Sequence, residues 1–254
     1  MLIVSLLVAP LLMFIVMWAE QRRGATTGGW VAALPVSLPM SVVTVAVDSG
    51  PRVADRLVWS VAGHVAAQVL FAAAFAAILH RAGFFRGLLA GTAAYGGLSV
   101  VLLALPVPAA AALAALALFF APRFVPTYGS PGASPRHPAV NALTCLGASV
   151  VVAAGVLGSR AAGPAVGGAL AAFPTMSTLL ALIVARRAGN SAGADALAGL
   201  VRSLPCYLAF CLCAAITMPA IGTLGIPLAL VACLAIGRLT WRSLAAAVSA
   251  PSAA

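Results

Sequence analysis

The positions of the arginines constrain the fold of this chain more than any other feature of its sequence. The chain has 14 basic residues, all of them arginine, and nearly all lie in short gaps between long apolar runs. Numbering the gaps as alternate sides of a membrane places ten on one side: Arg22, Arg23, Arg81, Arg86, Arg123, Arg136, Arg186, Arg187, Arg238 and Arg242. The other side receives Arg52, Arg56 and Arg160, and Arg202 lies inside an apolar run. Because cytoplasmic loops collect arginine, this split predicts nine crossings, with the N-terminus outside and the C-terminus in the cytoplasm.

The composition of the chain is typical of a protein whose solvent is lipid. Hydrophobic residues make up 63% of the sequence and charged residues 7%, which is more apolar surface than a water-soluble domain can bury. The net charge of +10 does not indicate a nucleic-acid partner, because the arginines flank apolar runs and form no basic patch interleaved with aromatic residues. The expected partner is the lipid bilayer, with the arginines beside its anionic headgroups.

Apolar runs long enough to cross a bilayer predict an all-α, polytopic transmembrane helical bundle of about nine spans. We expect spans at about Leu2–Ala19, Trp30–Val47, Leu57–Leu79, Gly87–Leu105, Pro106–Ala121, Ala139–Leu157, Ala165–Ala185, Ala196–Thr217 and Ile221–Leu239. The fifth span requires the apolar stretch Leu88–Ala121 to be divided at Pro106 and Pro108, which favour a tight hairpin. Without this hairpin the arginine bias disappears.

The two halves of the chain resemble each other in sequence. GWVAALPVSLPMSVVTVAVDSG precedes a span that ends FAAAFAAI, and GGALAAFPTMSTLLALIVARRAG precedes a span that ends FCLCAAI. This alignment pairs Pro35 with Pro174 and Ile78 with Ile216; chance similarity between alanine-rich helices is the alternative. Because the fifth span intervenes, the two copies have opposite topology. We therefore expect a first repeat over residues 1–105, a linking span and Pro/Gly-rich loop over 106–138, and a second repeat over 139–254.

Prolines interrupt the second and seventh spans at corresponding places. Pro35 and Pro39 lie in the second span, and Pro174 lies in the seventh. Proline removes a helical hydrogen bond and frees carbonyls that lipid cannot satisfy, so we expect both helices to break there and the breaks to meet near the bilayer midplane. Hydroxyl groups beside the breaks either bond the freed backbone or contact a substrate: Ser37, Ser41, Thr175 and Ser177.

Two ionisable side chains lie well inside predicted spans. His64 and Arg202 are each fourteen residues before the matched isoleucines, so they occupy equivalent positions in the two copies. A charge inside a span costs at least about 2.5 to 3.5 kcal/mol and is normally functional. Arg202 either reaches the cytoplasmic headgroups or anchors a carboxylate or phosphate, and His64 either hydrogen-bonds between helices or carries a coupling proton. Gln68 and Tyr207 extend these two polar sites.

The sequence contains no motif for catalysis or metal binding. There is no H-E-x-x-H, G-x-S-x-G or phosphate-binding glycine loop, and the five cysteines lie in predicted spans without a C-x-x-C pair. The four acidic residues are expected at span ends or in loops: Glu20, Asp48, Asp55 and Asp195. We therefore expect no metal, no cofactor and no enzyme activity, the alternative being a serine and a histidine that meet only in space.

The second half resembles the GlpM family of small, four-span bacterial inner-membrane proteins. The resemblance covers Ala139–Leu239 and is carried by GGALAAFPTMSTLLALIVARRAG, the charged loop after it, and LPCYLAF in the next span. The first half resembles the family only weakly, as a diverged second copy. This resemblance implies a multi-pass protein of the bacterial inner membrane with a duplicated origin, and it implies no activity. A duplicated four-span unit is also similar to the drug/metabolite transporter superfamily, at the level of the fold alone.

Inverted repeats favour a secondary carrier, because two copies related by an axis in the membrane plane can exchange conformations. We expect a small neutral or anionic solute to bind among the second, third, seventh and eighth spans. The alternative is a non-transporting accessory subunit of an envelope or polysaccharide assembly system. Besides the bilayer and a solute, a second copy of the chain in a homodimer is the partner that we consider.

Overall fold

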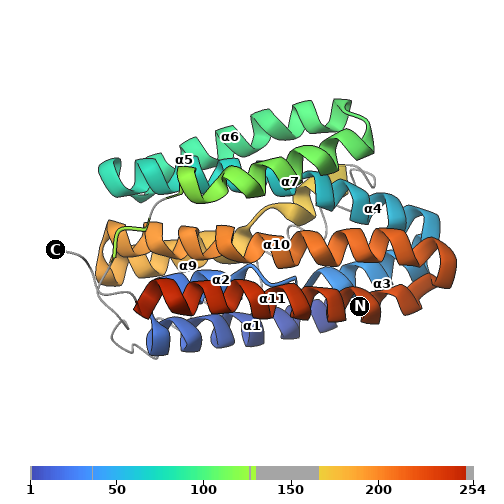
Figure 1. Ribbon diagram of the computed structural model, residues 1–254, viewed down its shortest axis with the longest axis horizontal. Coiled ribbons are helices and arrows are strands. Elements are labelled where there is room, and N and C mark those ends of the chain that lie inside the picture. Colours follow the sequence, from blue (N-terminus) through green and yellow to red (C-terminus); the bar gives the residue numbers. More distant parts are fainter. Residues whose placement is uncertain (1, 36, 126, 130–165, 250–254) are drawn as a thin grey trace.

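A computed structural model describes residues 2–35, 37–125, 127–129 and 166–249, and none of these residues forms a strand (Figure 1). The helices are α1 (Leu2–Arg23), α2 (Ala25–Ala32), α3 (Ser37–Ser49), α4 (Pro51–Gly63), α5 (Val65–Ala82), α6 (Phe84–Ala104), α7 (Val107–Phe124), α9 (Thr175–Ala188), α10 (Asn190–Ile221) and α11 (Gly225–Ser249). Residues 166–172 form a further helix before α9, and a short 3-10 helix, η1 (Gly222–Leu224), joins α10 to α11. The described part of the chain is therefore an all-α bundle, as the sequence predicts.

Helix α10 lies at the centre of the bundle. It packs against α2, α4, α5, α9 and α11, and most of its side chains are buried. The helices run roughly along one common axis, as Figure 1 shows. The buried core contains large side chains such as Phe71, Phe75 and Phe210 with alanines between them. Small residues allow such helices to approach closely when there is little driving force from water.

Three helix hairpins turn on single glycines at one end of the bundle. Gly24, Gly83 and Gly189 have φ values of 91°, 89° and 89°, in a region of backbone space that is open only to glycine when ψ is near 170°. A second glycine follows each one after four residues, at Gly28, Gly87 and Gly193, and faces the preceding helix so closely that a Cβ there would clash. Each hairpin therefore begins with two antiparallel helices in tight contact.

The outer surface of the bundle is apolar. Large exposed side chains lie along α1, α6, α7, α10 and α11, among them Phe14, Leu89, Phe119, Ile216 and Leu234. So extensive an exposed apolar surface is unsuitable for water and suitable for lipid. Within the described residues, five segments are long and apolar enough to cross a membrane: Pro51–Ala82, Phe84–Ala104, Val107–Phe124, Val166–Ala188 and Asn190–Trp241. The last contains both α10 and α11, which reverse direction at η1. The fold indicates a membrane protein.

The helix boundaries confirm one prediction from the sequence and correct two others. The predicted hairpin is present, since α6 ends at Ala104 and α7 begins at Val107. Arg52 and Arg56 lie on α4, which begins at Pro51, and not in a loop before a later helix. The linker expected from Ala121 begins later, because α7 continues through Phe124. The predicted span over 139–157, with Arg136, Cys145 and Arg160, lies outside the described residues.

Candidate functional site

Two helices of the bundle are interrupted at prolines. Helix α2 ends at Ala32 and α3 begins at Ser37, while the helix over 166–172 ends before Phe173 and α9 begins at Thr175. The breaks predicted at Pro35 and Pro174 are thus present, and both prolines are buried and not in contact with lipid. Pro39 does not break its helix, because it lies in the first turn of α3, where the backbone N–H has no helical acceptor.

Side chains from two other helices satisfy the carbonyls freed at the second break. The Gln68 side chain on α5 donates from Nε2 to the Ala172 carbonyl at 2.5 Å. The Tyr95 hydroxyl on α6 donates to the Ala169 carbonyl, also at 2.5 Å. Inside α9, the Thr178 hydroxyl donates to the Pro174 carbonyl at 2.9 Å. Because an unsatisfied carbonyl in a dry interior costs several kcal/mol, these donors stabilise the interruption in this conformation.

Aromatic rings pack around the same break. Phe173 contacts Phe71 and Tyr95 edge to face, with ring centroids 5.3 Å and 5.2 Å apart. Such edge-to-face contacts add about 0.5 to 1.5 kcal/mol to the burial of each pair. Phe173 is therefore held against α5 and α6, the helices whose side chains donate to the two freed carbonyls.

His64 lies at a kink between α4 and α5, one turn before Gln68. Its backbone has a ψ of −3°, and its ring Nδ1 lies 2.7 Å from the Ser60 carbonyl. A side chain that competes for a helical carbonyl is a recognised cause of kinks. The side chain is 2% exposed, and its Nε2 has no hydrogen-bond partner. The His64 ring lies 6.4 Å from the Tyr95 ring, so it adjoins the residues that hold the second break.

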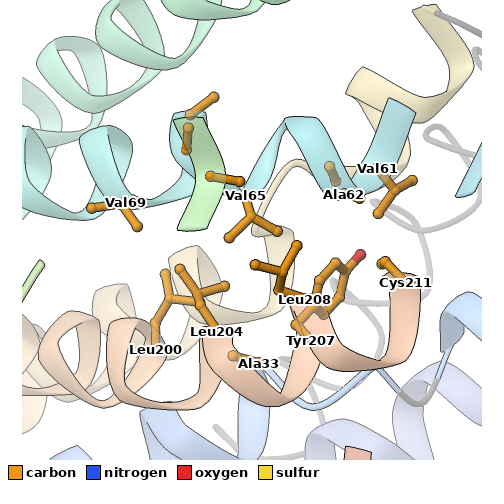
Figure 2. Close-up of a cluster of buried hydrophobic side chains, with 14 of the residues drawn as sticks. Ala33, Val61, Ala62, Val65, Val69, Leu200, Leu204, Tyr207, Leu208 and Cys211 are labelled. Atoms are coloured by element: carbon orange, nitrogen blue, oxygen red, sulfur yellow. The ribbon is translucent and has the colours of Figure 1, made fainter. Parts of the chain in front are cut away.

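Tyr207 on α10 connects the two broken helices. Its side chain is hydrogen-bonded to Gln68, which in turn bonds Ala172. Figure 2 shows Ala33, two residues before Pro35, beside Leu204 and Tyr207, while the Tyr207 ring points toward α4. The contacts thus run from the first break through Tyr207 and Gln68 to the second break. A direct approach of the two breaks to each other stays a prediction.

Arg202 does not belong to this group of contacts. It is partly buried on α10 and interacts electrostatically with Asp195, two turns earlier on the same helix. Asp195 is buried and accepts a hydrogen bond from the Tyr128 backbone N–H at 2.6 Å. Asp195 lies in the second turn of α10, near the end of that helix, where the protein and not water surrounds its carboxylate. Arg202 thus has a carboxylate partner within its own chain, a pairing that the sequence did not predict.

The remaining predicted hydroxyl residues have different surroundings. Thr175 is the first residue of α9, and Ser41 is half-buried on α3. Ser177 on α9 is 1% exposed, and its hydroxyl oxygen has no hydrogen-bond partner. Ser37 begins α3, and its side chain lies outside the described part of the structure.

Sequence reasoning missed the roles of three residues: Tyr95 and Thr178 at the second break, and Asp195 near Arg202. Thr178 follows Pro174 by four residues, the spacing at which a hydroxyl reaches a carbonyl one turn back, so that signal was present. Tyr95 is the only tyrosine in α6 and lies among apolar residues, which is a weaker signal. Nothing in the local sequence of Asp195 indicates that its carboxylate is buried.

In the part of the chain that the structure describes, neutral hydrogen-bonding side chains, and no charged ones, donate to the carbonyls at the second break. Within the described ranges, no three His, Cys, Asp or Glu side chains are placed to hold a metal ion. The polar groups at the second break are neutral donors and acceptors from α5, α6 and α10, and they surround an interrupted helix. Such groups can bind a solute through hydrogen bonds if the helices separate.

Searches of known protein families, of characterised proteins and of solved structures found no match to this chain. The GlpM-like character of residues 139–239 therefore stays a prediction from the sequence. What the chain does must be argued from its own geometry.

Proposed function

We propose that the protein is a multi-pass protein of the bacterial inner membrane with about nine spans and a cytoplasmic C-terminus. The ends of α1, α5 and α9 carry Arg22, Arg23, Arg81, Arg186 and Arg187 and meet at the glycine hairpins on the left of Figure 1. Only Arg52 and Arg56, on α4, lie toward the other end among the described residues. This asymmetry supports a cytoplasmic location for the hairpin end.

We further propose that the chain contains two inverted repeats, and equal spacing supports this. The break at Pro35 and the break at Pro174 are each followed fifteen residues later by a turn glycine, Gly50 and Gly189. Both glycines have a φ of 89°. The first broken helix runs away from the hairpin end and the second runs toward it (Figure 1), as opposite topology requires.

The observation that best supports the repeat is a pair of equivalent helix contacts, one made by each broken helix. Gly29 and Gly168 are each six residues before the break proline. A Cβ at Gly29 would meet Ala196 of α10, and a Cβ at Gly168 would meet Leu57 and Ser60 of α4. In the repeat alignment Ala196 corresponds to residue 58, between those two. Each broken helix thus packs on the long helix of the other copy at the equivalent place.

On this basis we propose a secondary carrier that moves a small neutral or anionic solute by alternating access. The two broken helices and the two long helices that they contact form the moving elements. Gln68, Tyr95 and Tyr207 supply neutral hydrogen-bonding groups at the second break. Arg202 supplies the cationic group that binds an anion, and the bound anion then replaces Asp195 as the partner of the guanidinium.

A specific observation favours a second candidate, a non-transporting accessory subunit of an envelope assembly system. The donors at the second break already satisfy the Ala169 and Ala172 carbonyls. A bundle whose interruption is stabilised internally can act as a static scaffold that packs its apolar surface on partner helices.

Flux into proteoliposomes tests the carrier against the scaffold. A panel of organic anions, sugars and other metabolites is offered to the wild type, to Pro174→Ala and to Pro205→Ala. We expect saturable uptake of one solute class by the wild type and reduced uptake by Pro174→Ala, which restores a helical hydrogen-bond donor at the break. Pro205 lies in the unbroken α10, so Pro205→Ala is the matched control and should transport normally. Absence of flux for every solute in both membrane orientations would contradict the carrier and favour the scaffold.

A further inference from the structure

We propose that Nε2 of His64 is a proton-binding site whose occupancy controls the helix break at Phe173–Pro174. The proposed carrier function matters only for what the proton does, because in a carrier this proton would be the coupling ion. The site itself follows from the hydrogen bonding of the imidazole and from the groups around it.

The hydrogen bond at Nδ1 determines which nitrogen is basic. Nδ1 lies 2.7 Å from the Ser60 carbonyl oxygen, which can only accept a hydrogen bond, so Nδ1 carries the proton. In the neutral ring Nε2 then carries a lone pair. That atom is buried and without a partner, although buried polar atoms are nearly always hydrogen-bonded. A proton is the smallest ligand that a buried lone pair can bind.

An acceptor for the added proton lies on the neighbouring helix α6. Phe71 packs on Gly91 and Phe75 on Gly87, so α5 and α6 are antiparallel. This register brings Ser99 to the level of His64. The Ser99 hydroxyl is buried and interacts with the Tyr95 side chain, and a hydroxyl oxygen with one such contact still has a lone pair to accept a hydrogen bond. Protonation of Nε2 creates a donor at this level of the bundle, so a small rearrangement joins it to the Ser99 oxygen.

Among the described residues, the groups that face His64 would leave an imidazolium charge uncompensated. Tyr95 faces it from α6, and Tyr207 and Cys211 face the α4–α5 kink from α10. Helix α7 presents Ala110 beside Gly63, and the 166–172 helix presents Gly168 beside Ser60. None of these is charged. The imidazolium is therefore favoured when the site opens to water or holds an anion, which is the dependence that coupling requires.

His64 is mechanically connected to the second break by two short paths. Gln68, four residues later on the same helix, holds the Ala172 carbonyl. Tyr95, whose ring adjoins His64, holds the Ala169 carbonyl. A change in the α4–α5 kink or in the α5–α6 packing thus moves both donors that stabilise the break. The proton comes from water on the side to which the site is open and leaves to water on the other.

Nitrogen NMR of histidine in the full chain, reconstituted in lipid nanodiscs, tests the site directly. The chain has three histidines, His64, His80 and His137, so the His80→Gln/His137→Gln variant reports on His64 alone. We expect a neutral ring protonated at Nδ1 at high pH and uptake of one proton at Nε2 as the pH is lowered. In the Ser99→Ala background the midpoint should fall by about one pH unit, the worth of one hydrogen bond to a charged group.

The coupling is measured in the same samples by hydrogen exchange of residues 166–178. We expect exchange there to accelerate as His64 is protonated, and no such change in His64→Gln. A neutral ring that carries its proton on Nε2, a ring that takes up no proton on acidification while the protein stays folded, or one that titrates without altering exchange at the break would overturn the proposal. Solute flux distinguishes failure of this proposal from failure of the proposed function. If His64 titrates but no solute is transported, the carrier function is wrong and the proton site stands. If solute is transported at a rate that depends on neither a pH gradient nor His64→Gln, the coupling is wrong and the carrier function stands.

Discussion

Gly29 on α2 and Gly199 on α10 face each other's helix backbones. A Cβ on Gly29 would lie 1.8 Å from the Ala196 carbonyl oxygen, and a Cβ on Gly199 would lie 2.0 Å from the Thr26 carbonyl oxygen. The obstructing atoms are backbone atoms, so neither can move out of the way by a change of rotamer. This reciprocal contact fixes the first broken helix against the central helix, and it is the closest helix approach that we find in the described structure.

Replacing either of these glycines should prevent normal assembly. Gly29→Ala and Gly199→Ala must separate α2 from α10, and we expect a loss of at least 1 to 3 kcal/mol, about the cost of overpacking a dense core. The yield of monodisperse protein and its thermal unfolding in detergent measure this loss. Gly96→Ala and Gly97→Ala are matched controls, because a Cβ at either position meets nothing within 4 Å. Equal stability of the two sets of variants would contradict the close contact.

The donors at the second break should contribute measurably to stability. Gln68→Leu and Tyr95→Phe each leave a buried carbonyl unsatisfied, at a cost of about 1 to 3 kcal/mol. Thermal unfolding at high pH should therefore show a lower midpoint for both variants. Ser177→Ala is the control, since the buried Ser177 hydroxyl has no partner and its loss should have little effect. If Tyr95→Phe unfolds like Ser177→Ala, the hydroxyl bond to Ala169 does not support the break.

The sequence predicts the interruptions at Pro35 and Pro174 because proline acts locally, by removing an N–H donor. The same reasoning is wrong at Pro39, because the effect of proline depends on its place in the helix. It also gives no warning that Pro205 and Pro219 lie in a helix that continues past them. Helix ends were underestimated where polar residues such as Arg52 and Asn190 continue a helix beyond its apolar run.

Residues whose roles depend on partners far away in sequence could not be predicted. The interruption between α4 and α5 at His64 has no proline; there the Ser60 carbonyl accepts hydrogen bonds from both the His64 backbone N–H and the His64 ring. Tyr95 and Asp195 act on Ala169 and Tyr128, which are 74 and 67 residues distant. A single sequence records which residues are polar, but the pairing of donors with acceptors appears only when helices are placed together.

Reporter fusions test the proposed nine spans. A reporter joined after Arg123 should be cytoplasmic, and one joined after Arg160 should be periplasmic, because one further crossing between them is needed for the arginines to gather on one side. Enzyme reporters that are active in only one compartment give the measurement. A fusion after Arg187, at the hairpin end of α9, is the control and should match the Arg123 fusion. If the fusions after Arg123 and Arg160 report the same compartment, the inverted repeat must be abandoned.

The interaction of Arg202 with Asp195 changes what a substitution of this arginine should do. Arg202→Gln removes the positive charge beside a buried carboxylate, so we expect a loss of stability of roughly 1 to 3 kcal/mol, below the 3 to 5 kcal/mol of a fully buried pair because the guanidinium is partly exposed. The Asp195→Asn/Arg202→Gln variant removes both charges and should recover most of that stability. Thermal unfolding of the two variants measures the difference.

Measurements of solute uptake then distinguish two roles of Arg202, binding of an anionic solute and contact with lipid headgroups. If Arg202 binds the solute, Asp195→Asn/Arg202→Gln should be folded and yet fail to take up an anion, since no other cationic side chain lies deep within the described helices. Arg202→Lys should restore uptake only in part, because an ammonium group lacks the two parallel donors that a guanidinium offers to a carboxylate or phosphate. Arg238→Gln, at an exposed arginine of α11, is the control and should transport normally. Wild-type uptake by the double variant would mean that Arg202 only positions α10 beside the headgroups, and the solute would then be a neutral molecule recognised by Gln68, Tyr95 and Tyr207.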